Sequence, residues 1–272
     1  LPTGIGKIAG GSVLFHGEDL TKKNNRELSR IRGKDIAMIF QDSMTSLNPV
    51  LTVGRQIEET IAVHSNASKQ EIRKQALDIL TKVGVSSPEQ RLKEYPHQLS
   101  GGMRQRVMIA MALSCNPNLL IADEPTTALD VTIQAQIIDL MVELKHKINA
   151  AIMLITHDMG VVAEMADSIM VMYAGQVVEY GTAREIFRNP LHPYTQGLLS
   201  SIPRLDKDVD RLYAIPGTVP SLNAMPEGCR FCVRCSCARP ECAVQKPPMV
   251  QTPTGQKVRC WKYKDCYPEV EG

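Results

Sequence analysis

A short apolar run followed by two acids, Leu119–Ala122 and then Asp123 and Glu124, constrains the fold of this chain most strongly. A run that is apolar at every position is typical of a strand buried on both faces, as in parallel sheets. Open α/β sheets place their ligands at the carboxyl ends of such strands. The two acids therefore predict a site at the carboxyl edge of a parallel sheet.

The elements around this strand are predicted from hydrophobic periodicity and turn signals. We expect strands over 12–16, 35–40, 119–122, 151–155, 168–173 and 175–180, and helices over 131–148 and 159–165. The alternation of strands and helices after residue 119 indicates a parallel sheet flanked by helices. The predicted fold class is therefore α/β.

Residues 53–115 have a helical pattern, and the chain carries three sequence signals for helix starts. The predicted capping boxes are Ser68 with Glu71, Ser87 with Gln90 and Pro88 at the first helical position, and Thr182 with Glu185. After Asn189 the sequence becomes rich in proline and cysteine, and its hydrophobic residues lose regular spacing. This change predicts a domain boundary near residue 190.

Composition excludes several classes of protein. The chain has 272 residues and a net charge of +2, so charge alone does not favour nucleic acid as a partner. Its longest apolar runs fall short of the roughly 18 residues that a membrane span needs. No secretory signal pattern opens the sequence. We expect a cytosolic protein that docks on a membrane protein.

A glycine pair precedes the helix that leads to the apolar strand. Ser100 can cap that helix, and Gly101 and Gly102 let backbone N–H groups approach a phosphate closely. With the later segment Asp123-Glu124-Pro125-Thr126-Thr127-Ala128-Leu129-Asp130, in this order and spacing, the segment Leu99-Ser100-Gly101-Gly102-Met103 resembles the signature and Walker B motifs of ABC-type ATPases. Met103 stands where that family usually has glutamine.

This resemblance implies a P-loop NTPase fold of the ABC type, with a helical subdomain at about 53–115. It implies an ABC ATPase domain over 1–189 and a Cys-rich C-terminal extension over 190–272. The implied ligands are ATP and Mg²⁺. The family's functional residues match Asp123 (magnesium), Glu124 (hydrogen-bond acceptor from the attacking water), His157 (switch histidine), Gln41 (Q-loop), Asp130 (D-loop) and Ser100, Gly101 and Gly102 (signature).

One motif of the family is missing from the sequence. No window matches the P-loop pattern GxxxxGK followed by Ser or Thr, which cradles the β- and γ-phosphates. Gly6-Lys7 comes nearest, but Ile8 replaces the magnesium-binding hydroxyl. We therefore expect a truncated ATPase, without its first strands and P-loop, that is inactive alone. The alternative is a degenerate subunit that lends its signature to an intact partner.

The region after residue 190 indicates the kind of transporter. Leu191-His192-Pro193-Tyr194-Thr195 and Ile215-Pro216-Gly217-Thr218-Val219-Pro220 resemble segments of ATPases from oligopeptide and dipeptide importers. The implied function is hydrolysis of ATP to energise peptide import. Nickel importers and microcin-type exporters share much of this pattern, so the sequence does not identify the transported solute. A soluble ABC ATPase of repair or translation is disfavoured by the near-neutral charge.

The same resemblance implies the partners and the location. Two ATPase subunits would pack head to tail, each completing the other's ATP site with its signature. Two membrane permease subunits and an extracytoplasmic peptide-binding protein would complete the transporter. The subunit would lie at the cytoplasmic face of the inner membrane as a peripheral protein.

Seven of the eight cysteines lie between Cys229 and Cys266, which indicates a local metal site. By resemblance the ligands are Cys229, Cys235, Cys242 and Cys260, holding a [4Fe–4S] cluster or Zn²⁺. Cys232, Cys237 and Cys266 are additional, and Cys229, Cys232 and Cys235 could supply three cluster ligands by themselves. Free thiols in a loose tail are the alternative.

Overall fold

The computed structural model describes residues 6, 8–41, 46–127, 130–147, 150–203 and 213–271. The chain divides into two compact units, unit 1 (Leu1–His157) and unit 2 (Asp158–Gly272). Some positions named above, Lys7, Ala128, Leu129 and Ile148, lie outside the described residues. Within the described ranges, no helix is long and apolar enough to cross a membrane.

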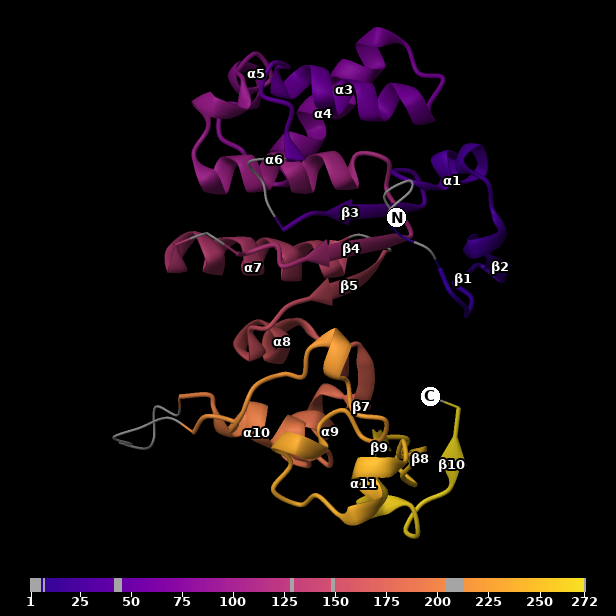
Figure 1. Cartoon of the computed structure of the whole chain (residues 1–272). Helices are drawn as coiled ribbons and strands as arrows, with labels where there is room; N and C mark the ends of the chain where they lie inside the picture. The colour runs from indigo at the N-terminus through magenta and orange to yellow at the C-terminus, as the bar shows by residue number, and fades with distance from the viewer. Residues whose placement is uncertain are drawn as a thin grey trace. The chain divides into compact units, whose positions relative to one another are not determined.

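Unit 1 combines a small parallel sheet with a group of helices (Figure 1). Its strands are β1 (Leu14–Phe15), β2 (Glu18–Asp19), β3 (Ile36–Ile39), β4 (Leu119–Asp123) and β5 (Ala151–Ile155). Its helices are α1 (Asn25–Ile31), α3 (Val53–His64), α4 (Lys69–Lys82), α5 (Pro88–Arg91), α6 (Gly101–Leu113) and α7 (Val131–Lys147), with 3-10 turns at Leu20–Lys22 and Pro96–Gln98. Helices α3 and α4 pack against α6, and α5 packs against α4, which confirms the predicted helical region (Figure 1).

The parallel sheet has the order β3-β4-β5, with the predicted apolar strand in its centre. Ile39 pairs with Ala122, and Ala122 pairs with Leu154, so the three strands end at the same level. Leu120 and Ala122 have no exposed surface, as expected for a central strand. The residues that follow the three strands therefore meet at one edge.

The two faces of this sheet differ in exposure. Ala37 and Ile39 of β3 are buried, and α6 packs against this strand. On the other face Met38, Ile121 and Met153 form one row across the three strands. Met38 is 39% exposed and Met153 is 51% exposed. The strand residues thus alternate between a covered face and an apolar face that is open in part.

Two of the three predicted capping boxes are confirmed. The Ser68 hydroxyl accepts from the Glu71 N–H at 3.4 Å, and Glu71 accepts in return from the Ser68 N–H at 2.7 Å. Thr182 and Glu185 form the same reciprocal pair at the start of α9 (Ala183–Arg188). Each pair satisfies N–H groups that the first helical turn leaves without an internal partner.

The third predicted capping box, Ser87 with Gln90, is wrong. Pro88 does occupy the first helical position, but Ser87 has a φ of 53° and its side chain makes no capping hydrogen bond. An N-cap residue needs extended backbone to aim its oxygen at the helix. Gln90 instead donates to Glu94 Oε1 at 2.9 Å. Left-handed backbone at Ser87 therefore removes the geometry that the motif assumes.

Unit 2 is built on an antiparallel sheet of order β10-β8-β9-β7-β6. Its strands are β6 (Ser168–Tyr173), β7 (Gln176–Thr182), β8 (Met249–Gln251), β9 (Lys257–Arg259) and β10 (Glu269–Val270). Its helices are α8 (Met159–Met165), α9 (Ala183–Arg188), α10 (Pro193–Ser200) and α11 (Pro240–Val244), with 3-10 turns at Leu222–Ala224, Cys232–Arg234 and Trp261–Tyr263. Strands on both sides of residue 190 thus belong to one sheet.

The structure corrects the expected position of strand 168–173. The alternation of elements placed it in the parallel sheet, but β6 pairs antiparallel with β7. Ala174 and Gly175 join the two strands, and both have positive φ, 48° and 75°. Such a two-residue turn matches the twist of an antiparallel hairpin. The tight turn therefore determines the strand's neighbour.

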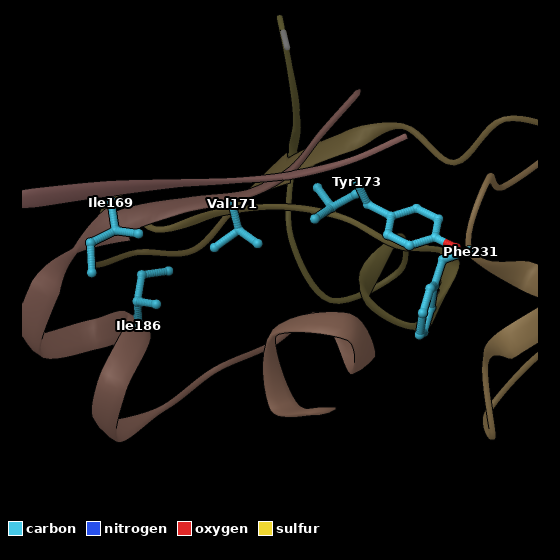
Figure 2. Close-up of a cluster of buried hydrophobic side chains, with 6 residues drawn as sticks. Ile169, Val171, Tyr173, Ile186 and Phe231 are labelled. Atoms are coloured by element: carbon cyan, nitrogen blue, oxygen red, sulfur yellow. The ribbon is translucent and has the colours of Figure 1, made fainter. Parts of the chain in front are cut away.

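The core of unit 2 forms where β6 faces α9 and the segment around Phe231 (Figure 2). Ile169, Val171 and Tyr173 point from β6 to the same side, and Ile186 of α9 lies against them. The Tyr173 and Phe231 rings meet edge to face, with centroids 5.1 Å apart. Aromatic pairs favour this arrangement, so the contact joins the cysteine-containing segment to the hairpin.

A buried carboxylate joins β7 to the start of α10. Glu179 has no exposed surface, and its oxygens accept from the Leu191 N–H at 2.7 Å and the His192 N–H at 2.9 Å. Gln256 Nε2 donates to the same carboxylate at 2.8 Å. Glu179 thus connects β7, the helix start at His192-Pro193 and the residue preceding β9.

Candidate active site

The candidate site begins where β4 leaves the sheet. Asp123 is the last residue of the strand, and Glu124 follows with a φ of 45°. The Glu124 N–H donates to the Ile155 carbonyl at 2.8 Å, which fixes the residue beside the end of β5. A left-handed backbone is uncommon for residues other than glycine and concentrates at functional sites. The backbone therefore sets where the Glu124 carboxylate stands.

Three side chains hold the Glu124 carboxylate. Gln41 Nε2 and the Thr127 hydroxyl donate to Oε2 at 2.7 and 2.8 Å, and His157 Nδ1 lies 3.1 Å from Oε1. The hydrogen bond from Thr127, followed by that from His157, lowers the pKa of Glu124 below its ordinary value. Donors favour the charged form of a carboxyl group. Glu124 is therefore an oriented carboxylate at neutral pH.

The parallel register explains why these residues meet. Gln41 follows β3, Glu124 follows β4 and His157 follows β5, so each side chain leaves the same edge. The sequence predicted all three as site residues, and the structure brings them together. The sequence analysis did not predict Thr127 as a site residue, although its hydroxyl reaches Glu124 from three residues further along the same loop. The only sequence signal for this contact was a hydroxyl-bearing residue three positions after Glu124.

Asp123 lies beside this cluster and is partly buried. Among the described residues, none donates a hydrogen bond to its side chain. Carboxylate oxygens at a strand end are the ligands that Mg²⁺ prefers. The donor chemistry of Asp123 thus fits the predicted magnesium ligand.

The predicted signature residues start α6. The Ser100 hydroxyl accepts from the Met103 N–H at 3.3 Å and so caps the helix, as predicted. Gly102 is buried, and a Cβ there would lie 2.7 Å from the Ile133 side chain of α7. The glycine at 102 therefore allows close packing of α6 on α7. Among the described residues, no hydrogen bond joins Ser100, Gly101 or Gly102 to the side chains around Glu124.

Asp130, the predicted D-loop acid, caps α7. Its Oδ1 accepts from the Ile133 N–H at 2.9 Å, and its carbonyl accepts from the Gln134 N–H at 2.8 Å. Asp130 itself is exposed. The structure thus gives this residue a local role at the helix start.

Six of the seven cysteines of unit 2 line one small cavity. Its lining includes the four predicted ligands Cys229, Cys235, Cys242 and Cys260, together with Cys232 and Cys237. The Cys229 N–H donates to the Cys242 carbonyl at 2.8 Å, which brings the two segments together. Cys266 is exposed and does not line this cavity.

Burial changes the acidity of these thiols. It raises the pKa of Cys229 to about 11, and neighbouring thiols add to the effect. Burial likewise raises the pKa of Cys235 and Cys260. Thiolates in such a place need a cation. Across the described residues, no group of three or more His, Cys, Asp or Glu side chains is arranged to hold a metal ion.

Two family models match this chain. The model "ABC transporter" matches residues 3–127, and the model "Oligopeptide/dipeptide transporter, C-terminal region" matches residues 178–242. Among solved structures, a dimeric post-hydrolysis state of the ATP-binding cassette MJ0796 bound to ADP and Pi is similar, with a TM-score of 0.58 and 30% identity over 65% of this chain and 75% of that chain. The fold and the site thus define an ABC-type ATPase cassette.

Curated relatives narrow the class. The oligopeptide transport ATP-binding protein AppD of Bacillus subtilis is 55% identical over 96% of this chain and 79% of its own length. The dipeptide transport ATP-binding protein DppD of the same organism is 51% identical over 96% of this chain and 78% of its own length. The chain belongs to the family of ATP-binding proteins of oligopeptide and dipeptide ABC transporters.

Proposed function

We propose that this subunit hydrolyses ATP to ADP and phosphate and thereby drives import of oligopeptides or dipeptides. One observation carries the chemical part of the proposal: Gln41, Glu124 and His157 meet at the carboxyl edge of the parallel sheet. The relatives AppD and DppD, named for oligopeptide and dipeptide transport, support the solute class.

Each residue of the cluster has a role in this proposal. Glu124 accepts a hydrogen bond from the attacking water, because it is an ionised carboxylate fixed at the sheet edge. His157 contacts the terminal phosphate, and Gln41 is the lever between nucleotide and permease. Asp123 would hold Mg²⁺, which neutralises charge on the phosphates.

The proposal includes a second ATPase subunit. Ser100, Gly101 and Gly102 form the start of α6 and, among the described residues, make no hydrogen bond to Glu124, so in this proposal they bind a partner subunit's nucleotide. Asp130 is exposed and would reach across the dimer. The dimeric MJ0796 cassette supports this arrangement.

The remaining partners and the location follow from the family. Two permease subunits and an extracytoplasmic peptide-binding protein would complete the transporter, with this subunit on the cytoplasmic face of the membrane. An ATPase domain over 1–189 and an extension over 190–272 are the proposed domains. The ABC transporter model matches residues 3–127, within the first part, and the C-terminal-region model matches residues 178–242, mostly within the second.

Uptake by whole cells tests the solute class. We expect cells without this gene to lose uptake of labelled oligopeptides and to regain it with the wild-type gene, because the permease needs ATP hydrolysis. Uptake of radioactive nickel in the same cells is the comparison. Loss of nickel uptake with intact peptide uptake would contradict peptide import.

The cysteine cavity is part of the proposal as a metal site. Cys229, Cys235, Cys242 and Cys260 would bind a [4Fe–4S] cluster or Zn²⁺. Thiolates are ligands of both groups and these four thiols line one cavity, but the described side chains would have to move to surround a metal. Burial raises the pKa of three of the thiols, so metal binding would have to displace their protons. When bound, the metal would stabilise the thiolates and join the segments that carry them.

Metal content tests this site. We expect anaerobically purified protein to contain iron with acid-labile sulfide, or zinc, and Cys229→Ser to lose the metal because one buried ligand is gone. Cys266→Ser is the matched control, since Cys266 is exposed outside the cavity. Protein without either metal, or equal loss in both variants, would contradict the proposal.

A further inference from the structure

Thr127 is tied to Glu124 twice. Its hydroxyl donates to Glu124 Oε2 at 2.8 Å, and its backbone N–H donates to the Glu124 carbonyl at 3.1 Å. The two bonds close a turn over residues 124–127. The acid and the hydroxyl that holds it are therefore fixed on one short piece of backbone.

The other two donors reach Glu124 from neighbouring strands. Gln41 shares Oε2 with Thr127, whereas His157 is the described partner of Oε1. The His157 side chain is 79% exposed, so solvent reaches it freely. In the proposed reaction Gln41 and His157 also serve the permease and the terminal phosphate. Both must then exchange partners during the cycle, whereas Thr127 need not.

We propose that Thr127 is a positioning residue for Glu124: its hydroxyl holds Oε2 so that Oε1 faces the attacking water when His157 turns to the phosphate. This inference rests on the proposed ATPase function. It assigns the two carboxylate oxygens different tasks, one fixed within the loop and one free to accept from water.

The electrostatics agree with this geometry. The Thr127 hydroxyl makes the largest contribution to the lowered pKa of Glu124, and His157 makes the next. A donor that stays in place keeps the carboxylate ionised when the others leave. Removing the hydroxyl should therefore raise the pKa of Glu124 and loosen its orientation.

The test is the ATPase activity of the assembled transporter with Thr127→Val, Thr127→Ser and Glu124→Gln. Valine keeps the shape of threonine without the hydroxyl, and serine keeps the hydroxyl. We expect Thr127→Val to lower kcat roughly tenfold, the size of one lost hydrogen bond to a charged group, with an unchanged KM for ATP. The acid limb of its pH–kcat profile should move to higher pH. Thr127→Ser should restore both values.

Thr254→Val is the matched control, because Thr254 belongs to unit 2 and its side chain hydrogen-bonds a different glutamate, Glu185. It should leave kcat and the pH profile unchanged. Wild-type kcat and pH profile in Thr127→Val, or equal losses in the valine and serine variants, would overturn the inference. If Glu124→Gln also retains full turnover, the proposed function itself fails. If only Glu124→Gln is inactive, the function stands and the role of Thr127 falls.

Discussion

Glu124→Gln is expected to reduce ATP turnover by the assembled transporter by at least a hundredfold, within the range of a lost general base. Glutamine fits the same place but is neutral and accepts a hydrogen bond from water more weakly. Binding of ATP should persist, because the Glu124 carboxylate is held by Gln41, Thr127 and His157 rather than by a phosphate-binding group. Steady-state hydrolysis and equilibrium binding of a labelled nucleotide measure the two effects separately.

Glu143→Gln is the control for this change. Glu143 pairs with Lys147 on the exposed surface of α7, and such pairs contribute little to stability. This variant should hydrolyse ATP at the wild-type rate. Equal turnover in Glu124→Gln and wild type would contradict the role assigned to Glu124.

Glu179→Leu is expected to destabilise unit 2 by about 3 kcal/mol or more, since it leaves buried donors without an acceptor. Those donors are the Leu191 N–H, the His192 N–H and Gln256 Nε2. Leucine is similar in size, so the loss reports on the hydrogen bonds more than on volume. Urea unfolding followed by the fluorescence of Trp261, the single tryptophan of the chain, measures unit 2 directly.

Two further variants separate the causes. Glu179→Gln keeps one acceptor oxygen and should cost less than Glu179→Leu. Glu269→Leu makes the same change on exposed β10 of the same sheet and should be nearly neutral. An unfolding midpoint for Glu179→Leu that equals the wild-type value would show that the buried network contributes nothing.

The pH dependence of this stability has a defined sign. Burial raises the pKa of Glu179 above its ordinary value of 4.5. Its contribution to stability is therefore fully present below 4.5 and is lost as the pH rises through the raised pKa. His192 acts in the opposite sense, because burial lowers its pKa from 6.5 to about 4. Because His192 is present in both proteins, the difference in unfolding free energy between the wild type and Glu179→Gln at each pH measures the Glu179 contribution.

Much of the candidate active site was predictable from the sequence because it depends on the ends of parallel strands. The apolar run before Asp123 identified the central strand, and the register of β3, β4 and β5 then brought Gln41 and His157 to Glu124. Local patterns predicted the strands, whereas Gln41 and His157 were assigned to the site by resemblance to the family.

Other features depend on backbone geometry that side-chain patterns do not reveal. Ser87 has the sequence of a cap but left-handed backbone, and strand 168–173 pairs through a tight turn with the strand that follows it. Thr127 is identified as a partner of Glu124 only when the loop's turn is seen. The partial exposure of Met153 likewise depends on what packs against β5, which its apolar sequence does not specify.

The most direct measurement is ATP hydrolysis by the transporter, assembled with its permease subunits in vesicles, with and without peptide-loaded binding protein. The proposed function predicts hydrolysis that rises when the loaded binding protein is added and that disappears with Glu124→Gln. Hydrolysis that does not respond to peptide, or that survives this substitution, would contradict it.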